Sequence, residues 1–461
     1  MRTPSLKLSV CAALMAVVLY GCQDPAGSTA PDLPVRAGKA AGGTTTTGPV
    51  VSSTNPSSSV RNVTLNVRIL GSGFDRGSTA QWAIKGVPSA KVKTNSTTYV
   101  SQRELVANIT IAADADVTLY DVIVTTGSGK PGIGTESFEV TLQVTDVGTL
   151  SGDLTSLPWA VNNEGYVLGF SYADNYAVQR YFIKSGNTFH VFPGGGLTAR
   201  AISNGTTAFL AGSTVPNNAA RLTFNPATGF SAPTVLDNLG GYMGQGQAVN
   251  DVGDVSGWIA YSVPGGYTYD AVIWKMDGTT TKAVNPNPAM YPRLEARDIN
   301  NSGHTIIHCE GPGPERGYVR MVDGTMIELP PLAGHVSTLV AAMSEVNFGK
   351  MYVVGNSSDD AGNYTSVRWT IDVATSSILT TLSRTDRSTA SGIGDDGTVV
   401  GTIQGVGNTQ GYLWRQEWFM NLRPPSGGTS SRGRAISSDG RFILGDAKHG
   451  SNTRAALWSW Q

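Results

Sequence analysis

The stretch that decides the fold is Arg434-Ala435-Ile436-Ser437-Ser438-Asp439-Gly440, followed by the aliphatic strand Phe442-Ile443-Leu444-Gly445. Its pattern is a small residue, an aliphatic residue, a turn rich in Asn, Asp or Ser that ends in Gly, and an aliphatic strand that usually ends in Gly. The pattern recurs along the chain, and aligned copies begin at Trp159, Arg200, Gln247, Arg297, Ala341, Ser391 and Arg434. A spacing of about 45 residues with four short strands per copy is typical of a β-propeller blade.

The two ends of the repeated region predict how a ring of blades closes. The last copy stops at Ala456–Trp460, after three strands, and Val144–Leu150 has the pattern of a strand without a blade of its own. Because closure removes exposed sheet edges, we expect residues 143–150 to complete the last blade. The sequence therefore predicts a seven-bladed β-propeller over residues 143–461. Six or eight blades would require a different reading of the fifth copy, whose irregular turn ends at Gly349.

The copies resemble the HAF repeat, a family of extracellular repeats with the consensus Ala-x-Ile-Asn-x-x-Gly-x-Val-Val-Gly and a following Ala-Phe-Leu-Trp strand. Aromatic residues occupy the corresponding third strands, namely Trp274, Trp369, Trp414 and Trp458. The resemblance covers residues 143–461 and implies a bacterial extracellular protein.

A smaller unit precedes the repeats, over residues 50–142. Short runs such as Val63–Ile69 alternate apolar and polar residues between turns, which predicts an immunoglobulin-like β-sandwich. The order resembles the IPT/TIG family through its start at Pro56, its Gly71-Ser72-Gly73-Phe74 motif and its late strand Tyr120–Thr125. That resemblance implies a spacer or protein-contact domain. The predicted fold class is therefore all-β, with a sandwich ahead of a propeller.

The N-terminus has the features of a targeting signal. Arg2 and Lys7 precede the mostly apolar run Leu8–Tyr20, which is too short to span a bilayer. The following Gly21-Cys22 resembles the lipobox of bacterial lipoproteins, which implies cleavage after residue 21, lipidation of Cys22 and, with Gln at position 23, delivery to the outer membrane or cell surface. The alternative is a plain secretory signal with a chance cysteine. Residues 22–49 are rich in Gly, Thr, Ser and Pro and predict a flexible tether.

Composition excludes several classes of protein. Charged residues are 15% of the chain and 56 of 461 residues are Gly, which argues against helical bundles and coiled coils. A formal net charge of −1 argues against a nucleic-acid partner, which requires a basic excess. After cleavage only Cys22 and Cys309 remain, so we expect a fold without disulfides.

The first residue of each copy is the best candidate for ligand binding. Trp159, Arg200, Gln247, Arg297 and Arg434 would gather near one mouth of the channel if they lie on innermost strands, and three arginines there would attract a carboxylate or sulfate. The alternative is pairing with local acids, since Glu295 and Asp298 lie beside Arg297.

We expect the variable loops between second and third strands on the same face as these residues. Tyr172 to Gln179 and Ala260 to Tyr269 are two of them, and they supply Tyr172, Tyr267 and Tyr269 as further candidate binding residues. The same composition is also ordinary for loops.

Metal and catalytic motifs are weak. The Asn/Asp-Gly turns are typical of tight hairpins and lack the spacing of calcium loops. His308 and Glu310 would share one face of a strand, but a metal site there would need ligands from another blade, and we interpret His308 as a replacement of the usual strand-ending Gly. We expect no metal, no cofactor and no hydrolase triad.

Three classes of function remain open. The first is a lipid-anchored, non-enzymatic binding or scaffold protein whose propeller face recognises a glycan or protein. The second is a polysaccharide-degrading lyase or hydrolase, and the third is a structural component of the envelope. The sequence favours the first, because no carboxylate pair accompanies the arginines.

Overall fold

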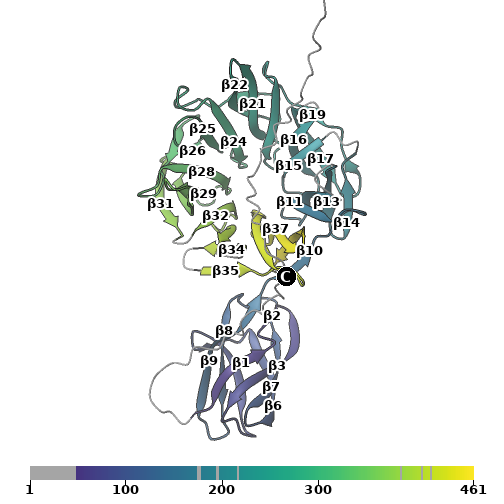
Figure 1. Cartoon of the computed structure of the whole chain (residues 1–461), viewed down its shortest axis with the longest axis vertical. Helices are drawn as coiled ribbons and strands as arrows, with labels where there is room; N and C mark the ends of the chain where they lie inside the picture. The colour runs from purple at the N-terminus through teal and green to yellow at the C-terminus, as the bar shows by residue number, and fades with distance from the viewer. Residues whose placement is uncertain are drawn as a thin grey trace, which may run out of the picture.

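The computed structural model describes residues 48–173, 178–193, 197–214, 217–384, 387–405, 409–415 and 418–460. Within these ranges the chain forms β-strands and no α-helix, and thus no helix long and apolar enough to cross a membrane. The expected signal peptide, Cys22 and nearly all of the expected tether lie outside the described residues. The fold is all-β, and Figure 1 shows a ring of sheets with a two-sheet unit at its rim.

Each sheet of the ring begins with a strand near the centre. These inner strands are β11 (Thr155–Val161), β15 (Leu197–Ile202), β20 (Met243–Val249), β24 (Arg293–Ile299), β28 (Ser337–Met343), β32 (Ser388–Ile393) and β36 (Ser430–Ile436). Each inner strand contacts the inner strand of the next sheet, and β36 contacts β11. The arrangement is that of a β-propeller.

Antiparallel partners follow each inner strand outward. The second strands are β12 (Val167–Tyr172), β16 (Ala208–Thr214), β21 (Val255–Val263), β25 (Thr305–Glu310), β29 (Lys350–Ser358), β33 (Val399–Gln404) and β37 (Phe442–His449). The third strands are β13 (Arg180–Ser185), β17 (Asn218–Asn225), β22 (Gly266–Trp274), β26 (Arg316–Arg320), β30 (Tyr364–Asp372), β34 (Thr409–Arg415) and β38 (Asn452–Ser459). Third-strand Trp274, Trp369, Trp414 and Trp458 are buried between sheets.

The outer strands complete the sheets. They are β14 (Thr188–Val191), β18 (Gly229–Phe230), β19 (Thr234–Val235), β23 (Thr280–Lys282), β27 (Met326–Leu329), β31 (Ser377–Ser383) and β35 (Trp418–Leu422). The sheet of β36, β37 and β38 is completed by β10 (Gln143–Asp146), which pairs with β38 from Gln143–Ser459 to Asp146–Ala456. A single parallel pair, Tyr269–Arg293, joins the sheet of β20–β23 to that of β24–β27.

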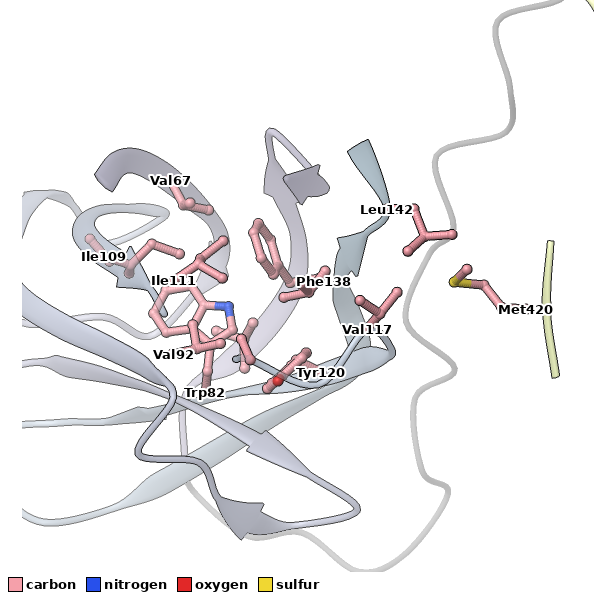
Figure 2. Packing of buried hydrophobic residues seen from close by; sticks show 14 of the residues in the cluster. Val67, Trp82, Val92, Ile109, Ile111, Val117, Tyr120, Phe138, Leu142 and Met420 are labelled. Atoms are coloured by element: carbon pink, nitrogen blue, oxygen red, sulfur yellow. The ribbon is translucent and has the colours of Figure 1, made fainter. Parts of the chain in front are cut away.

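The unit at the rim consists of two sheets around one core. One sheet has the order β1 (Val50–Asn55), β3 (Val63–Ser72), β7 (Glu104–Ile111), β6 (Val92–Ser101), and the other β2 (Ser58–Val60), β9 (Pro131–Thr141), β8 (Leu119–Thr125), β4 (Thr79–Ile84), β5 (Val87–Pro88). Burial alternates along β7, because successive side chains point to opposite faces of a strand. Trp82, Tyr120 and Phe138 fill the space between the sheets (Figure 2).

The rim unit packs against the last two sheets of the ring. Leu142 and Met420 belong to one buried cluster, and Figure 2 shows them facing each other across the junction. Arg423 donates a hydrogen bond to Ser58 Oγ at 2.9 Å and forms an ion pair with Glu139. Arg61 donates to the carbonyl oxygen of Trp460 at 3.2 Å. The junction therefore combines apolar burial with charged hydrogen bonds, which limits motion between the two units.

Candidate functional site

Each inner strand of the ring contains a β-bulge, and the bulges occur at one aligned position. The register with the second strand shifts at Trp159, Arg200, Gln247, Arg297, Ala341, Ser391 and Arg434. A bulged residue has no direct cross-strand partner, and its side chain is redirected relative to its neighbours. The first residue of each sequence copy is therefore the bulged residue of its inner strand.

The bulges lie near one end of the ring and the variable hairpins near the other. Each bulge is two residues before the end of its inner strand, next to the turn that leads into the second strand. We call this face the turn end, and the face of the connections between second and third strands the hairpin end. The expectation that both sets of residues share one face is wrong, because the second strand runs the full depth of the ring between them.

Two of the three candidate arginines have an acid on their own sheet. Arg297 Nε lies 3.2 Å from Glu295 Oε2, and Arg434 Nε lies 2.6 Å from Asp446 Oδ2. Asp298, the other acid beside Arg297 in the sequence, instead accepts backbone N–H bonds from residues 299 and 343. These arginines thus balance buried carboxylates.

Arg200 differs from the other two arginines. In the described part of the chain it forms no ion pair, and its buried Nε has no hydrogen-bond partner. Its guanidinium lies 4.6 Å from the ring centroid of Trp159, on the neighbouring inner strand. Burial lowers the pKa of Arg200, with Tyr181 and Glu295 acting in the opposite direction. Among the described residues, Arg200 is therefore a candidate arginine at the centre of the ring that is held by an aromatic ring and not by a carboxylate.

Tyr172 is not available to a ligand. Only 8% of its surface is exposed, and its ring stacks on Phe170 with centroids 6.2 Å apart. Phe170 in turn contacts Trp159 at 6.1 Å, so these aromatic residues pack the first sheet against the centre. The prediction of a binding role for Tyr172 placed it in a loop, whereas it is the last residue of β12.

The hairpin of β21 and β22 carries a strip of aromatic side chains. Trp258 and Tyr269 stack with centroids 4.9 Å apart and 14° between planes, and Tyr242 stacks on Tyr267 at 6.0 Å. Tyr242 is 66% exposed and Tyr267 43%, while the other two are half-buried. We call Trp258, Tyr269, Tyr267 and Tyr242 the aromatic strip. Trp258, Tyr267 and Tyr269 lie on this hairpin, and Tyr242 precedes β20 and donates its backbone N–H to Ala260 at the hairpin end.

Strand register places the strip on one face of the hairpin. Tyr269 opposes Ala260 and Tyr267 opposes Ser262, so both project on the same side as Trp258. Pairing extends to Val263 and Gly266, and the expected loop from Ala260 to Tyr269 is therefore mostly strand. The sequence analysis missed Trp258 and Tyr242 because it assigned binding to loops, whereas a count of alternate positions along paired strands could have found Trp258.

Charged groups border the aromatic strip. The Arg293 guanidinium lies 5.6 Å from the ring centroid of Tyr269, and Arg293 Nη1 is 2.8 Å from Glu310 Oε1. On the inner strand of the same sheet, buried Glu295 pairs with Arg297. A ligand lying on the strip would thus meet the Arg293–Glu310 ion pair beside Tyr269.

His308 is a buried residue of β25. It is 2% exposed, and burial, followed by the charge of Arg297, holds its pKa well below the usual range. The described residues contain no group of three or more His, Cys, Asp or Glu placed to hold a metal ion. Glu310, its expected partner, pairs with Arg293.

Ile307, not His308, stands where the other second strands have Gly. Gly169, Gly212, Gly257, Gly355, Gly401 and Gly445 oppose the residue before the bulge, and Ile307 opposes it in the fourth copy. A Cβ at Gly445 would lie 1.9 Å from the Arg432 carbonyl oxygen, so the bulge needs this close approach. His308 instead opposes Glu295, and in the described structure both have a buried side-chain atom without a hydrogen-bond partner.

The turn end is joined by hydrogen bonds from each turn to the next. The backbone N–H of Asn163 donates to Asn204 Oδ1 at 3.0 Å, and the same contact recurs from Asn204 to Asp251 and from Asp251 to Asn301. The N–H of Asn301 then donates to Glu345 Oε2 at 2.9 Å. We call Asn163, Asn204, Asp251, Asn301, Glu345, Asp395 and Ser438 the turn ring.

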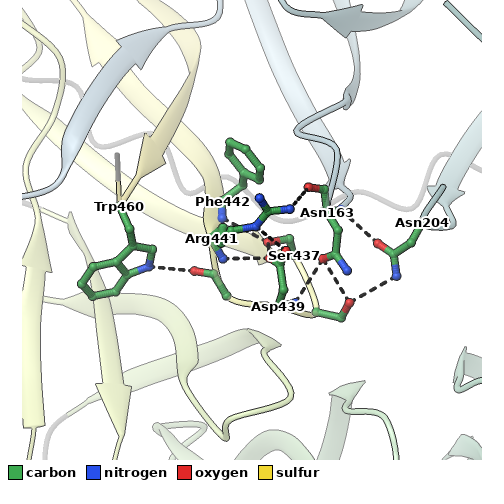
Figure 3. A network of polar contacts seen from close by, with 9 residues as sticks. Asn163, Asn204, Ser437, Asp439, Arg441, Phe442 and Trp460 are labelled. Atoms are coloured by element: carbon green, nitrogen blue, oxygen red, sulfur yellow. Dashed lines mark hydrogen bonds and ion pairs between the residues drawn. The ribbon is translucent and has the colours of Figure 1, made fainter. Parts of the chain in front are cut away.

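The remaining contacts close the turn ring. Glu345 N–H donates to Asp395 Oδ1 at 2.9 Å, Asp395 N–H to the Ser438 carbonyl oxygen at 2.7 Å, and Asp439 N–H to Asn163 Oδ1 at 3.1 Å. Figure 3 shows the last of these, between Asp439 and Asn163. The Ser438 hydroxyl lies 3.1 Å from Asn163 Oδ1 and 3.2 Å from Asn204 Nδ2. The Asn and Asp residues of the repeat therefore bind neighbouring turns, a role that the sequence analysis did not assign to them.

Comparisons with known proteins bear on the fold alone. No family model matches the chain, and no curated protein matches it. Solved structures with similar folds include the β-propeller domain of the Trilobed protease from Pyrococcus furiosus, at 8% identity over 89% of this chain and 95% of that chain, with a TM-score of 0.33. Others are the Pyrococcus horikoshii acylaminoacyl peptidase, at 10% identity over 87% and 57% with a TM-score of 0.35, and the Trypanosoma rangeli sialidase, at 11% over 75% and 56% with a TM-score of 0.34. The activities in these names are those of the solved proteins and are not assigned to this chain.

Proposed function

We propose that this protein is a lipid-anchored, non-enzymatic binding protein of the bacterial cell surface, in which a propeller presents a glycan-binding face. In this proposal residues 143–461 form seven blades closed by residues 143–150, and residues 50–142 form an immunoglobulin-like spacer. The contacts from β11 round to β36 and back, and one bulge in each inner strand, support the blade count.

The observation that carries the binding function is the aromatic strip. Sugar rings have apolar faces that stack on Tyr and Trp, while their hydroxyl groups hydrogen-bond to charged side chains at the border. Tyr267 and Tyr242 offer exposed rings, and the Arg293–Glu310 pair supplies donors and acceptors beside Tyr269. Arrays of exposed aromatic residues are rare on monomeric surfaces that bind nothing.

The charged groups near the strip favour binding over catalysis. A glycosidase needs one carboxylate free to act as an acid and another as a base or nucleophile. Here Glu310 pairs with Arg293 and Glu295 with Arg297, so an ion pair already occupies each carboxylate. The site is therefore better suited to orienting a ligand than to cleaving it.

Titration of the mature protein with oligosaccharides identified on a glycan array tests the proposal. Tyr267→Ala should weaken binding of the best ligand about tenfold, because one stacking surface is lost. Tyr364→Ala is the matched control, since Tyr364 lies at the tip of the β29–β30 hairpin on the same end. Binding that is unaffected by Tyr267→Ala, or turnover of the bound glycan, would overturn the proposal.

The anchor is tested separately. Cys22→Ala should release the protein from membranes, because neither the sheets nor the tether contains an apolar segment of spanning length. Retention of this variant in the membrane fraction would contradict lipidation at Cys22.

A further inference from the structure

One turn at the turn end departs from the repeat. The connection from β28 to β29 covers residues 344–349 and forms a tight turn, in which Asn347 and Lys350 exchange backbone hydrogen bonds of 2.8 and 3.0 Å. The two central residues, Phe348 and Gly349, have φ angles of 49° and 73°. Turns with two positive φ angles strongly favour Asn, Asp or Gly, and a bulky residue is unfavourable there.

Phe348 is also nearly fully exposed. Its exposed fraction is 96%, the highest among the large apolar residues of the described chain. Stability therefore explains neither its conformation nor its exposure, since Asn would satisfy the turn and remove an apolar side chain from water. A strained, exposed aromatic residue of this kind points to contact with a ligand.

A cavity of about 310 Å³ lies beside this turn. It is lined by Asn347, Phe348, Lys350, Tyr352, Asp395 and Asp396. Tyr352 forms part of its wall against Gly397, where a Cβ would lie 3.2 Å from the tyrosine ring. The cavity therefore joins two aromatic rings of one sheet to two carboxylates from the turn of the next.

Three cations lie around the cavity. Arg415 forms an ion pair with Asp396, and the Arg368 guanidinium lies 5.0 Å from the ring centroid of Tyr352 and donates to the carbonyl oxygen of Gly397. Lys350 lines the cavity and opposes Asp372 across β29 and β30; the pKa of that carboxyl is lowered chiefly by the backbone N–H of Thr375, with a smaller contribution from Lys350. Asp395 has no ion pair with Lys or Arg within the described ranges, and neither do its turn-ring neighbours Glu345 and Asp251. Uncompensated negative charge thus remains on the side of the cavity that faces the turn ring.

We propose that this cavity binds an alkylammonium group, supplied by a lysine side chain of a partner protein or by a free aliphatic amine. Phe348 provides aromatic surface for the cation and its alkyl stem, Tyr352, whose ring already contacts the Arg368 guanidinium, adds to the wall of the cavity, and Asp395 provides the counter-charge. A cation there also relieves repulsion among Asp395, Glu345 and Asp251. Burial, followed by the charges of Asp396, Asp439 and Asp251, raises the pKa of Asp395. Burial, followed by the charges of Asp395, Asp251 and Asp298, raises the pKa of Glu345 to about 7.

Calorimetric titration of the mature protein with two amines tests the proposal. Nα-acetyl-lysine amide represents the side chain of a partner, and hexylamine represents a free amine; tighter binding of one identifies the source. The matched control is the Nε-acetylated form of the lysine probe, which keeps the stem and loses the charge. Amine binding at least tenfold tighter than that of the acetylated control is expected. Equal binding of charged and neutral probes, or binding of neither amine, would overturn it.

Two variants locate the binding to this cavity. Phe348→Asn should raise the melting temperature, because Asn accepts the positive φ angle, yet weaken amine binding about tenfold. Asp395→Asn should weaken binding while keeping an acceptor for the Glu345 N–H. Phe419→Ala, an aromatic change on the exposed strand β35, should leave amine binding unchanged. Unaltered amine affinity in both cavity variants would refute the assignment, and because the aromatic strip lies at the other end, glycan binding reports on a different site.

Discussion

The turn end and the hairpin end of the ring are built in different ways. At the turn end, residues of the sequence repeat contact one another from sheet to sheet, and buried Asn162, Asn250 and Asn300 each donate a side-chain hydrogen bond to a carbonyl oxygen of the next turn. At the hairpin end, the connections differ in length, and the aromatic strip belongs to the sheet of β20–β23 alone among those described.

This difference teaches where function should be sought in such a ring. A residue type that recurs in every copy contacts its equivalent in the next copy. These contacts hold the ring together, which explains why the residue type recurs. A residue that departs from the repeat has no such explanation. Tyr267 at one end and Phe348 at the other are of this kind, and both are exposed aromatic residues.

The largest effect is expected from opening the ring. Deletion of residues 143–150 removes β10 together with buried Val147 and Leu150, and it should lower the melting temperature by about 10 °C or more. Deletion of residues 48–142 should have a smaller effect, because it leaves the sheet of β36–β38 complete and removes only the junction at Leu142 and Arg423. Equal melting of the two deletion variants in calorimetry would show that β10 does not close the ring.

A single substitution at the turn end should cost stability without affecting ligand binding. Asn300 is 2% exposed, donates to the Ser344 carbonyl oxygen at 3.3 Å and accepts the His304 N–H at 3.1 Å. Asn300→Ala should reduce the free energy of unfolding by about 2–3 kcal/mol, because buried backbone groups lose their partners. Urea denaturation measures this loss, and Tyr267→Ala at the opposite end should change it by less than about 0.5 kcal/mol. A reversed order would contradict the contrast between the two ends.

The turn end should also be sensitive to pH. The pKa of Glu345 is raised to about 7 in the folded protein, chiefly by burial, so the folded state holds its proton more tightly than the unfolded chain. The stabilisation is present below the unfolded pKa and is lost as the pH rises through about 7. Between pH 5 and 8 the free energy of unfolding should fall by at most about 2 kcal/mol for this group, because partial exposure screens it. Glu345→Gln should flatten the slope, and an unchanged slope would contradict the origin assigned to it.

The smallest difference in stability is expected between variants that replace one or the other of two arginines at the centre. Arg434→Gln leaves the 4%-exposed carboxylate of Asp446 without its cation, and should cost about 1–2 kcal/mol, since the arginine itself is 40% exposed. Arg200→Gln removes only the contact with Trp159 and should cost about half as much. Thermal melts of the two variants compare them, and a greater loss for Arg200→Gln would show that Arg200 has a structural partner.

The repeat predicted the strands and turns because each copy carries its own hydrophobic alternation and turn residues. It did not predict the contacts between copies, which depend on where one turn lies against the next. One error concerned the alignment of the fourth copy with the others. Every inner strand has the bulge at the same place, and the pairing of Ile307 with Ala296 corresponds to that of Gly169 with Pro158, so Ile307 rather than His308 occupies the glycine position.

Long-range pairing also limited the prediction of the site. Arg434 and Asp446 lie on neighbouring strands, and their contact follows from register rather than from sequence spacing. The aromatic strip combines residues from β20–β21 and β22 in the same way. The residue types were visible in the sequence, whereas their grouping required the register of paired strands.

The pairing of β10 with β38 fixes an order of folding events. Thr145 hydrogen-bonds to the carbonyl oxygen of Leu457, a residue 312 positions later in the chain, so the first strand of the ring to be synthesised is the last to find its partner. Until β38 is complete, β10 and the edge of β38 expose backbone groups that other chains could capture. The entropy of closing so long a loop is recovered only when the intervening sheets have formed and brought the two ends together. Assembly of the ring should therefore be slow, and the chain should be prone to aggregation until β10 pairs with β38. A chaperone that shields β10 would act before that pairing.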